Sequence, residues 1–182
     1  MTKRAHKKFE RNPRDFYATP SSAVLPLLPH LPPAAHYDEP CAGEGDLIKH
    51  LSAYGHYCEQ ATDISPPNRM KSKSIDALDI NECRSKMFIT NPPWDRKTLH
   101  PIITRLSNLA PTWLLFDADW MHTKQSIEFM PRCEKIVSIG RVSWMGNGVS
   151  GFDNCAWYLF DVMNKETTKF IGRTWKTGQK RQ

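Results

Sequence analysis

Two consecutive prolines fix the place where a strand must end in this chain. The run Met87-Phe88-Ile89-Thr90 is β-prone, and Asn91, Pro92, Pro93 and Trp94 follow it directly. Proline has no backbone N–H for a strand ladder, so the strand cannot continue past Asn91. The sequence predicts that the Asn91 amide sits at a rigid strand end with its carbonyl oxygen free. The Asn91 side chain, the Pro92 carbonyl and the Trp94 ring together are suited to binding a planar amine.

A second motif lies upstream and has the pattern of a strand, a glycine-rich turn and a helix. It reads Tyr-Asp-Glu-Pro-Cys-Ala-Gly-Glu-Gly-Asp-Leu-Ile over residues 37–48. Gly43 and Gly45 let the backbone turn tightly and approach a ligand. The third glycine of a dinucleotide fingerprint and the Gly-Lys-Ser/Thr of a phosphate loop are missing. Glu39, at the expected strand end, would repel a pyrophosphate but attract an ammonium group.

Acidic residues between these two motifs complete a predicted cofactor site. Asp63 follows a plausible second strand, eighteen residues past Gly45. A carboxylate in that place can accept hydrogen bonds from both hydroxyls of a ribose. A short third strand is expected over residues 74–78, and an acid there, Asp76 or Asp79, would hold the amino group of an adenine.

These motifs resemble those of a known enzyme family. Asn-Pro-Pro-Trp resembles the catalytic tetrapeptide of S-adenosylmethionine (AdoMet)-dependent amino-methyltransferases, which methylate planar amino groups such as adenine N6. Asp-Phe-Tyr-Ala-Thr-Pro at 15–20 looks like the Tyr-x-Thr-Pro segment of N6-adenine DNA methyltransferases. The motif order is similar to the γ arrangement of that family. Segments 140–144 and 154–160 resemble the closing hairpin of small phage-type members, so the resemblance covers about 15–163. The added domain that often reads DNA sequence in this family has no counterpart here.

The resemblance implies a catalytic role for Asn91, Pro92, Pro93 and Trp94. The Asn91 side chain and the Pro92 carbonyl would accept hydrogen bonds from the two hydrogens of the amine. The amine nitrogen would then attack the AdoMet methyl group by in-line displacement. No strong base is required, because the proton becomes acidic once the nitrogen is methylated. An adenine in duplex DNA must leave the stack, and Trp94 would face its ring while Trp144 closes over it.

The resemblance also implies a set of AdoMet-binding residues. Family patterns place the adenine-contacting acid before two apolar residues, which favours Asp76 over Asp79. The implied cofactor-binding residues are Tyr17, Thr19, Pro20, Glu39, Pro40, Cys41, Ala42, Gly43, Gly45, Asp63, Ile64, Asp76, Ala77 and Asn91.

Other substrates fit the same tetrapeptide. Enzymes that methylate a guanine amine in RNA or a glutamine amide in protein share Asn-Pro-Pro-aromatic, so both stay open beside adenine N6 in DNA. Protein-glutamine enzymes usually have Tyr in the last position and a separate helical N-terminal domain, which is missing here. A non-enzymatic alternative is a decayed methyltransferase that acts as a nucleic-acid-binding subunit. It predicts loss of the glycines or of Asn91, and neither is lost.

The order of elements predicts one α/β domain over residues 15–164. We expect a Rossmann-like class I methyltransferase fold with a mostly parallel, seven-stranded sheet and a terminal antiparallel hairpin. Strands are expected at 36–40, 57–63, 74–78, 112–116, 135–144 and 156–163, and a further strand is expected to end at Asn91. Helices are expected near 22–28, 46–54, 97–109 and 123–130.

Positive charge is concentrated at the two ends of the chain. Residues 1–14 contain six Lys or Arg and one acidic residue, and so do residues 165–182. With 25 basic and 19 acidic residues in total, the middle holds 13 basic and 17 acidic ones. The sequence therefore predicts two flexible basic tails on an acidic body, which suits contact with nucleic-acid phosphates, with DNA favoured over RNA. The alternative is a pair of solubilising ends.

Composition excludes several other classes of protein. At 182 residues and 40% hydrophobic residues, the chain can build one core. It has no apolar run long enough for a membrane span and no signal peptide. The five cysteines lack a CxxC pair and the seven histidines lack a ligand spacing, so we expect reduced thiols, no metal site and a cytoplasmic location, in the host cell if the chain is phage-encoded.

Overall fold

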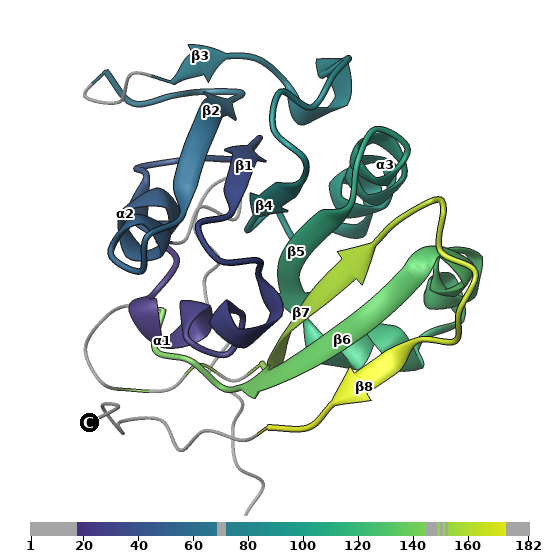
Figure 1. The fold of residues 1–182 in the computed structure, drawn as a ribbon. Coiled ribbons are helices and arrows are strands. Elements are labelled where there is room, and N and C mark those ends of the chain that lie inside the picture. Colours follow the sequence, from purple (N-terminus) through teal and green to yellow (C-terminus); the bar gives the residue numbers. More distant parts are fainter. Residues whose placement is uncertain (1–17, 69–71, 145–148, 150, 152, 174–182) are drawn as a thin grey trace, which may run out of the picture.

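The core of the structure is an eight-stranded sheet (Figure 1). The computed structural model describes residues 18–68, 72–144, 149, 151 and 153–173. Across the sheet the strands follow the order β3-β2-β1-β4-β5-β7-β6-β8. Their bounds are β1 (His36–Glu39), β2 (Tyr57–Asp63), β3 (Lys73–Ser74), β4 (Phe88–Thr90), β5 (Thr112–Asp117), β6 (Cys133–Gly140), β7 (Cys155–Phe160) and β8 (Lys169–Ile171).

Most neighbouring strands are parallel. β1 pairs in parallel with β2 and β4, β2 with β3, and β4 with β5. β7 runs antiparallel to both β5 and β6, which gives the closing hairpin. The predicted α/β fold with a mostly parallel sheet is confirmed, but the described residues form eight strands instead of seven.

The additional strand comes from the segment predicted to be a basic C-terminal tail. β8 pairs in parallel with the outer edge of β6, with Ile136 opposite Phe170 and Val137 opposite Ile171. Ile171 packs against the core cluster, which explains why this short apolar stretch joins the sheet. Residues 169–171 therefore belong to the domain, and the predicted boundary at residue 164 falls too early.

Helices and 3-10 turns connect the strands. The α-helices and 3-10 helices of the described residues are α1 (Ser21–Val24), η2 (Leu28–His30), α2 (Asp46–Ser52), η3 (Ala77–Asp79), α3 (Arg96–Ser107), η4 (Ala118–His122), η5 (Lys124–Glu128) and η6 (Met130–Arg132). The helix predicted over 22–28 is thus a short α-helix followed by a 3-10 turn, and the helix predicted over 123–130 is 3-10.

The third predicted strand, over 74–78, is wrong beyond Ser74. The Asp76 carboxylate accepts a hydrogen bond from the Leu78 N–H at 2.9 Å and caps η3. An aspartate that bonds to a backbone N–H two residues later offers the chain a turn in place of a strand ladder. Asp76 therefore follows the strand and begins a turn.

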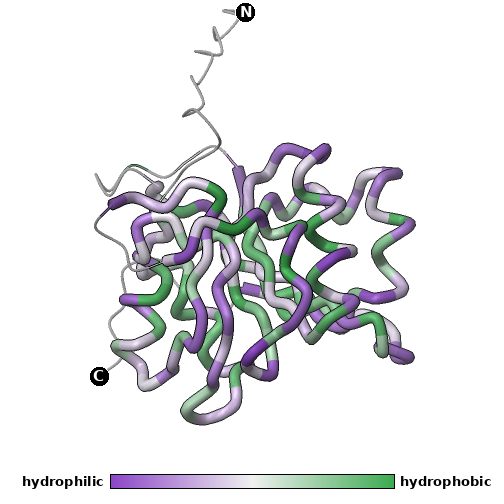
Figure 2. Tube along the Cα trace, turned by 90° about the horizontal axis from the view of Figure 1, so that it is seen from above, coloured by the Kyte–Doolittle hydropathy of each residue, from purple (hydrophilic) through white to green (hydrophobic). Residues whose placement is uncertain are grey.

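Each face of the sheet buries its own hydrophobic cluster. In β5, Trp113 and Leu115 lie in the cluster under α1 and α2, and Leu114 and Phe116 lie in the cluster under α3. This alternation is expected, because successive side chains of a strand point to opposite faces. Figure 1 shows the two helical layers on the two sides of the sheet. Seen from above, hydrophobic stretches run between loops whose tips are mainly hydrophilic (Figure 2).

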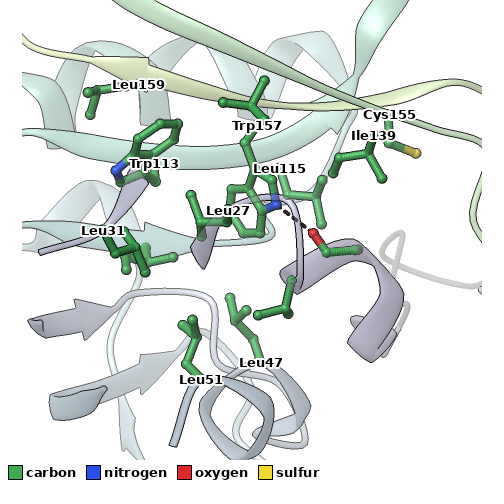
Figure 3. Packing of buried hydrophobic residues seen from close by; sticks show 14 of the residues in the cluster. Leu27, Leu31, Leu47, Leu51, Trp113, Leu115, Ile139, Cys155, Trp157 and Leu159 are labelled. Carbon is green, nitrogen blue, oxygen red and sulfur yellow. Dashed lines mark hydrogen bonds between the residues drawn. The ribbon is translucent and has the colours of Figure 1, made fainter. Parts of the chain in front are cut away.

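A buried hydrogen bond ties α1 to the antiparallel part of the sheet. The Trp157 indole N–H, in β7, donates to the Ala23 carbonyl oxygen at 2.8 Å (Figure 3). Trp157 and Ala23 are both fully buried in the cluster under α1 and α2. The short helix α1 is therefore held at a fixed position relative to the sheet.

The strand order reverses between β1 and β4. From β1 the chain proceeds outward through β2 to β3, whereas β4 begins on the opposite side and leads to β5. Ligands of open α/β sheets bind at such a switch point, outside the carboxyl ends of the strands. Glu39 ends β1, Asp63 ends β2 and Asn91 follows β4, so the predicted motifs meet at this edge.

Candidate active site

A cavity of about 760 Å³ opens at the carboxyl ends of β1, β2 and β4. Twelve of the predicted site residues line it: Thr19, Glu39, Pro40, Cys41, Ala42, Gly43, Asp63, Ile64, Asp76, Ala77, Asn91 and Pro93. Five further predicted residues are not on its wall: Pro20, Gly45, Pro92, Trp94 and Trp144. Tyr17 lies outside the described residues, as do most of the two basic tails.

The glycine turn and Asp63 hold each other in place. Gly43 and Gly45 have φ angles of 50° and 81°, in the left-handed region that side chains disfavour. The Gly43 N–H donates to Asp63 Oδ2 at 2.8 Å, and the Ser65 N–H donates to Asp63 Oδ1 at 2.8 Å. Both carboxylate oxygens are thus fixed by the backbone on the cavity wall, where each has capacity for a further donor.

Glu39 is a buried acid on the cavity wall, and no described basic residue forms an ion pair with it. It is 2% exposed, and within the described part of the chain its Oε2 atom has no hydrogen-bond partner. Burial raises its pKa well above 4.5, and the negative charges of Asp63 and Asp46 raise the pKa further. A cationic group in the cavity would relieve both effects.

The cavity wall is acidic and its thiol is unreactive. Five acidic residues line it, whereas Lys97 is the basic residue among the described lining residues: the acids are Glu39, Glu44, Asp46, Asp63 and Asp76. Burial raises the pKa of the Cys41 thiol to about 12. Cys41 therefore stays a thiol at neutral pH and does not provide a nucleophile.

Apolar side chains form another part of the wall. Ile64 is 63% exposed and Leu78 is 38% exposed, although both are large and apolar. They line the cavity together with Asp76, whereas Asp79 does not. Exposed apolar side chains beside a carboxylate suit an adenine ring with its amino group. Of the two candidate acids, Asp76 therefore lies on the cavity wall, and its contact with an adenine stays a prediction.

Asn91 is fixed at both ends of its amide. Its Nδ2 donates to Thr19 Oγ1 at 3.2 Å, and its Oδ1 accepts a hydrogen bond from the Trp94 indole N–H at 3.2 Å. The expectation that the Asn91 carbonyl oxygen is free is therefore wrong, because Trp94 turns its ring nitrogen back toward the strand end. A carbonyl oxygen has two lone pairs, so it can also accept from a substrate amine.

Trp94 and Trp144 form an aromatic corner next to Asn91. Their ring centroids are 5.4 Å apart and their planes meet at 83°. Trp144 lies just after β6, and the Gly151 N–H closes this loop by donating to the Val142 carbonyl at 2.8 Å. The two predicted substrate-contacting residues, fifty positions apart in the sequence, are thus neighbours.

Several lining residues were not predicted from the sequence. They are Ala18, Glu44, Asp46, Leu47, Ser65, Leu78, Lys97, Thr98 and Ile102. Lys97, Thr98 and Ile102 belong to α3, which begins two residues after Trp94. A helix that directly follows a site strand starts at the same sheet edge, and this signal could have identified the first turn of α3.

Two further observations concern the described residues. They contain no cluster of three or more His, Cys, Asp or Glu side chains arranged for a metal ion. The longest described helix, α3, has 12 residues, and no described helix has the length and apolar character needed to cross a membrane.

Comparison of the sequence with family models and with curated proteins found no match. Solved structures do match the fold. A proposed RNA methyltransferase from Pyrococcus horikoshii has 14% identity and a TM-score of 0.56 over 85% of this chain and 92% of that one. A dimethyladenosine transferase from Plasmodium falciparum has 14% identity and a TM-score of 0.53. A chain from a type I R-M system has 13% identity and a TM-score of 0.52.

These likenesses show that the chain has a Rossmann-like α/β fold, which it shares with the two methyltransferase structures. The match covers 80% of this chain but 62% of the Plasmodium enzyme, and 90% of this chain but 46% of the type I chain. At 13–14% identity the likeness concerns the fold alone.

Proposed function

We propose that this protein is an AdoMet-dependent methyltransferase that modifies a planar exocyclic amino group, adenine N6 of DNA being the proposed substrate. The observation that carries the proposal is the position of Asn91. It lies on the wall of the cavity and also bonds to Trp94 of the aromatic corner. One amide thus borders both a space of cofactor size and a surface suited to a flat ring.

The cavity fits AdoMet on three counts. Its volume of about 760 Å³ is in the range of small-molecule sites. The buried Oε2 of Glu39 has no partner among the described residues and suits the ammonium group of the cofactor. Asp63 suits the ribose hydroxyls, and Ile64 and Asp76 suit the adenine. When bound, AdoMet supplies an electrophilic methyl group for transfer to the amine nitrogen.

The residues beside the cavity would prepare the amine. The lone pair of an aromatic amine is delocalised into its ring, which makes the nitrogen a weak nucleophile. Asn91 Oδ1 and the Pro92 carbonyl would accept its two hydrogens and favour the tetrahedral geometry that attack requires. Trp94 and Trp144 would position the ring by stacking and edge contact.

RNA is a second candidate substrate. It is favoured by the similarity of the fold to a proposed RNA methyltransferase. The likeness to a dimethyladenosine transferase supports an adenine amine as the acceptor. The type I R-M system, in contrast, is a restriction–modification assembly. The aromatic corner suits a base from either nucleic acid and is less apt for a glutamine amide, which has no ring.

The proposal is tested with the full chain and AdoMet labelled in its methyl group. Calorimetry should show AdoMet binding, and mass spectrometry should find the label in N6-methyladenine after incubation with DNA. Parallel incubations with RNA and with a protein digest separate the substrate classes. Label found in RNA alone would identify RNA, and not DNA, as the substrate. Tight AdoMet binding without label in any substrate class would contradict the enzymatic proposal.

A further inference from the structure

We infer that Thr19 is a positioning residue, which holds the Asn91 amide in the one orientation that can accept a hydrogen from a substrate amine. The inference rests on the proposed function and extends it. Thr19 is 5% exposed, lines the cavity, and accepts a hydrogen bond from Asn91 Nδ2 at 3.2 Å. The two residues are 72 positions apart in the chain.

The orientation matters because the two ends of a primary amide have opposite roles. The oxygen accepts hydrogen bonds, and the NH₂ group only donates them. If the Asn91 amide rotated by half a turn, its NH₂ would face a substrate NH₂, and two donors would oppose each other. Catalysis by the proposed mechanism therefore requires a device that excludes the rotated form.

The two neighbours of Asn91 provide this device. An indole N–H can donate and never accept, so Trp94 requires an oxygen on its side of the amide. Thr19 has an oxygen that can accept, so it stabilises the NH₂ group on the other side. Trp94 selects this orientation, because rotation of the amide would place two donors against each other there. Thr19 holds the selected amide in place from the other side, because its hydroxyl oxygen accepts from the NH₂ group.

The position of Thr19 is itself well fixed. It immediately precedes Pro20, and a residue before proline is restricted to an extended backbone. Pro20 caps α1, and α1 is tied to β7 by the bond from Trp157 to the Ala23 carbonyl (Figure 3). Both partners are therefore attached to the sheet. Thr19 is attached through α1 and β7, and Asn91 directly follows β4.

Two substitutions at Thr19 test the inference. Thr19→Val keeps the shape of the side chain but removes the hydroxyl, and Thr19→Ser keeps the hydroxyl. Turnover is measured at saturating AdoMet and saturating substrate, so that a changed cofactor affinity does not enter. Loss of one neutral hydrogen bond predicts that Thr19→Val lowers kcat by about 3- to 10-fold. Thr19→Ser should stay within about twofold of the wild type. A kcat of Thr19→Val equal to that of the wild type, or an equal loss in both variants, would overturn the inference.

A second readout does not depend on turnover. The side-chain NH₂ signals of Asn91 in ¹⁵N NMR spectra can be assigned by their loss in Asn91→Ala. They should shift in Thr19→Val and stay near their original position in Thr19→Ser. Unshifted Asn91 signals in Thr19→Val would overturn the inference even if the wild type methylates its substrate. If the signals behave as expected and no substrate class is methylated, the bond stands and the proposed function fails, together with the role of Thr19 in it.

Discussion

At the scale of single residues, the cavity contains one buried carboxyl group, Glu39, whose charged form is disfavoured by its surroundings. Glu39 is buried beside Asp63 and Asp46, and both burial and these charges raise its pKa. Tyr37, Cys41 and Cys58 also face this group and carry no charge at neutral pH, because burial raises the pKa of each. The described residues thus offer Glu39 no compensating cation, and a bound ammonium group would supply one.

This arrangement predicts that AdoMet binding releases a proton. Free protein holds Glu39 protonated above pH 4.5, up to its raised pKa, whereas the ligand ammonium favours the carboxylate. AdoMet affinity should therefore rise with pH over this interval and become constant above it. Calorimetry in two buffers of different ionisation enthalpy measures the released proton directly. Glu39→Gln should abolish the buffer difference, and Glu82→Gln, at an exposed site, should preserve it.

The same group has a predicted effect on stability. Because the folded state binds the proton more tightly than the unfolded state, the free energy of unfolding should fall as pH rises from 4.5 through the raised pKa. Thermal unfolding without ligand should show that Glu39→Gln removes this decline. A wild-type protein whose stability is constant from pH 5 to pH 8 would contradict the assigned state of Glu39.

At the scale of elements, the sequence predicted the site strands better than the connections between them. Strand 57–63 was predicted with its observed bounds, since it has a β-prone composition and ends in a turn. The strand expected over 74–78 ends at Ser74, because the capping bond of Asp76 depends on local geometry that the apolar pattern does not reveal. The partner of Asn91 Oδ1 was likewise missed, because no sequence pattern shows how an indole ring is rotated.

Asp63 connects two elements, the end of β2 and the glycine turn after β1. Asp63→Ala should weaken AdoMet binding by about 1–3 kcal/mol, since it removes a charge-assisted contact to the ribose and frees the Gly43 N–H. Asp63→Asn can keep an acceptor for Gly43 and should lose less. Calorimetry measures both affinities. The control is Asp161→Ala, which also removes a carboxylate that accepts a backbone N–H, but at the end of β7. Unchanged affinity in Asp63→Ala, with the fold intact, would move the ribose contact elsewhere.

At the scale of the whole molecule, an acidic domain carries positive charge at the ends of its chain. The structure changes how this feature should be tested, because residues 169–171 form β8. A deletion that begins at residue 168 would remove an edge strand as well as charge. Residues 174–182 hold three basic residues and no acidic one, and their deletion spares the sheet.

Deleting residues 1–14 or 174–182 should lower DNA affinity and flatten its dependence on salt. Each lost phosphate contact should reduce the slope of log affinity against log salt by about 0.9 for duplex DNA or about 0.7 for a single strand. The methyl-transfer rate at saturating DNA should barely change. Lys176→Gln, Lys180→Gln and Arg181→Gln together keep the length and remove the charge, so they should match the C-terminal deletion. An unchanged salt slope in both deletions would identify the two ends as solubilising segments.

The most direct test of the account concerns Asn91. Labelled methyl transfer to adenine N6 is measured for the wild type, for Asn91→Ala and for Asn108→Ala. Asn108 is a matched control, because it caps the C-terminal end of α3, whereas Asn91 precedes the N-terminal end. We predict that Asn91→Ala lowers kcat by about 10²-fold or more, because it removes the acceptor that acts on the amine in the transition state. AdoMet affinity should stay within several-fold of the wild type, and Asn108→Ala should turn over like the wild type. Turnover of Asn91→Ala at the wild-type rate would contradict the central claim that this amide performs the chemistry.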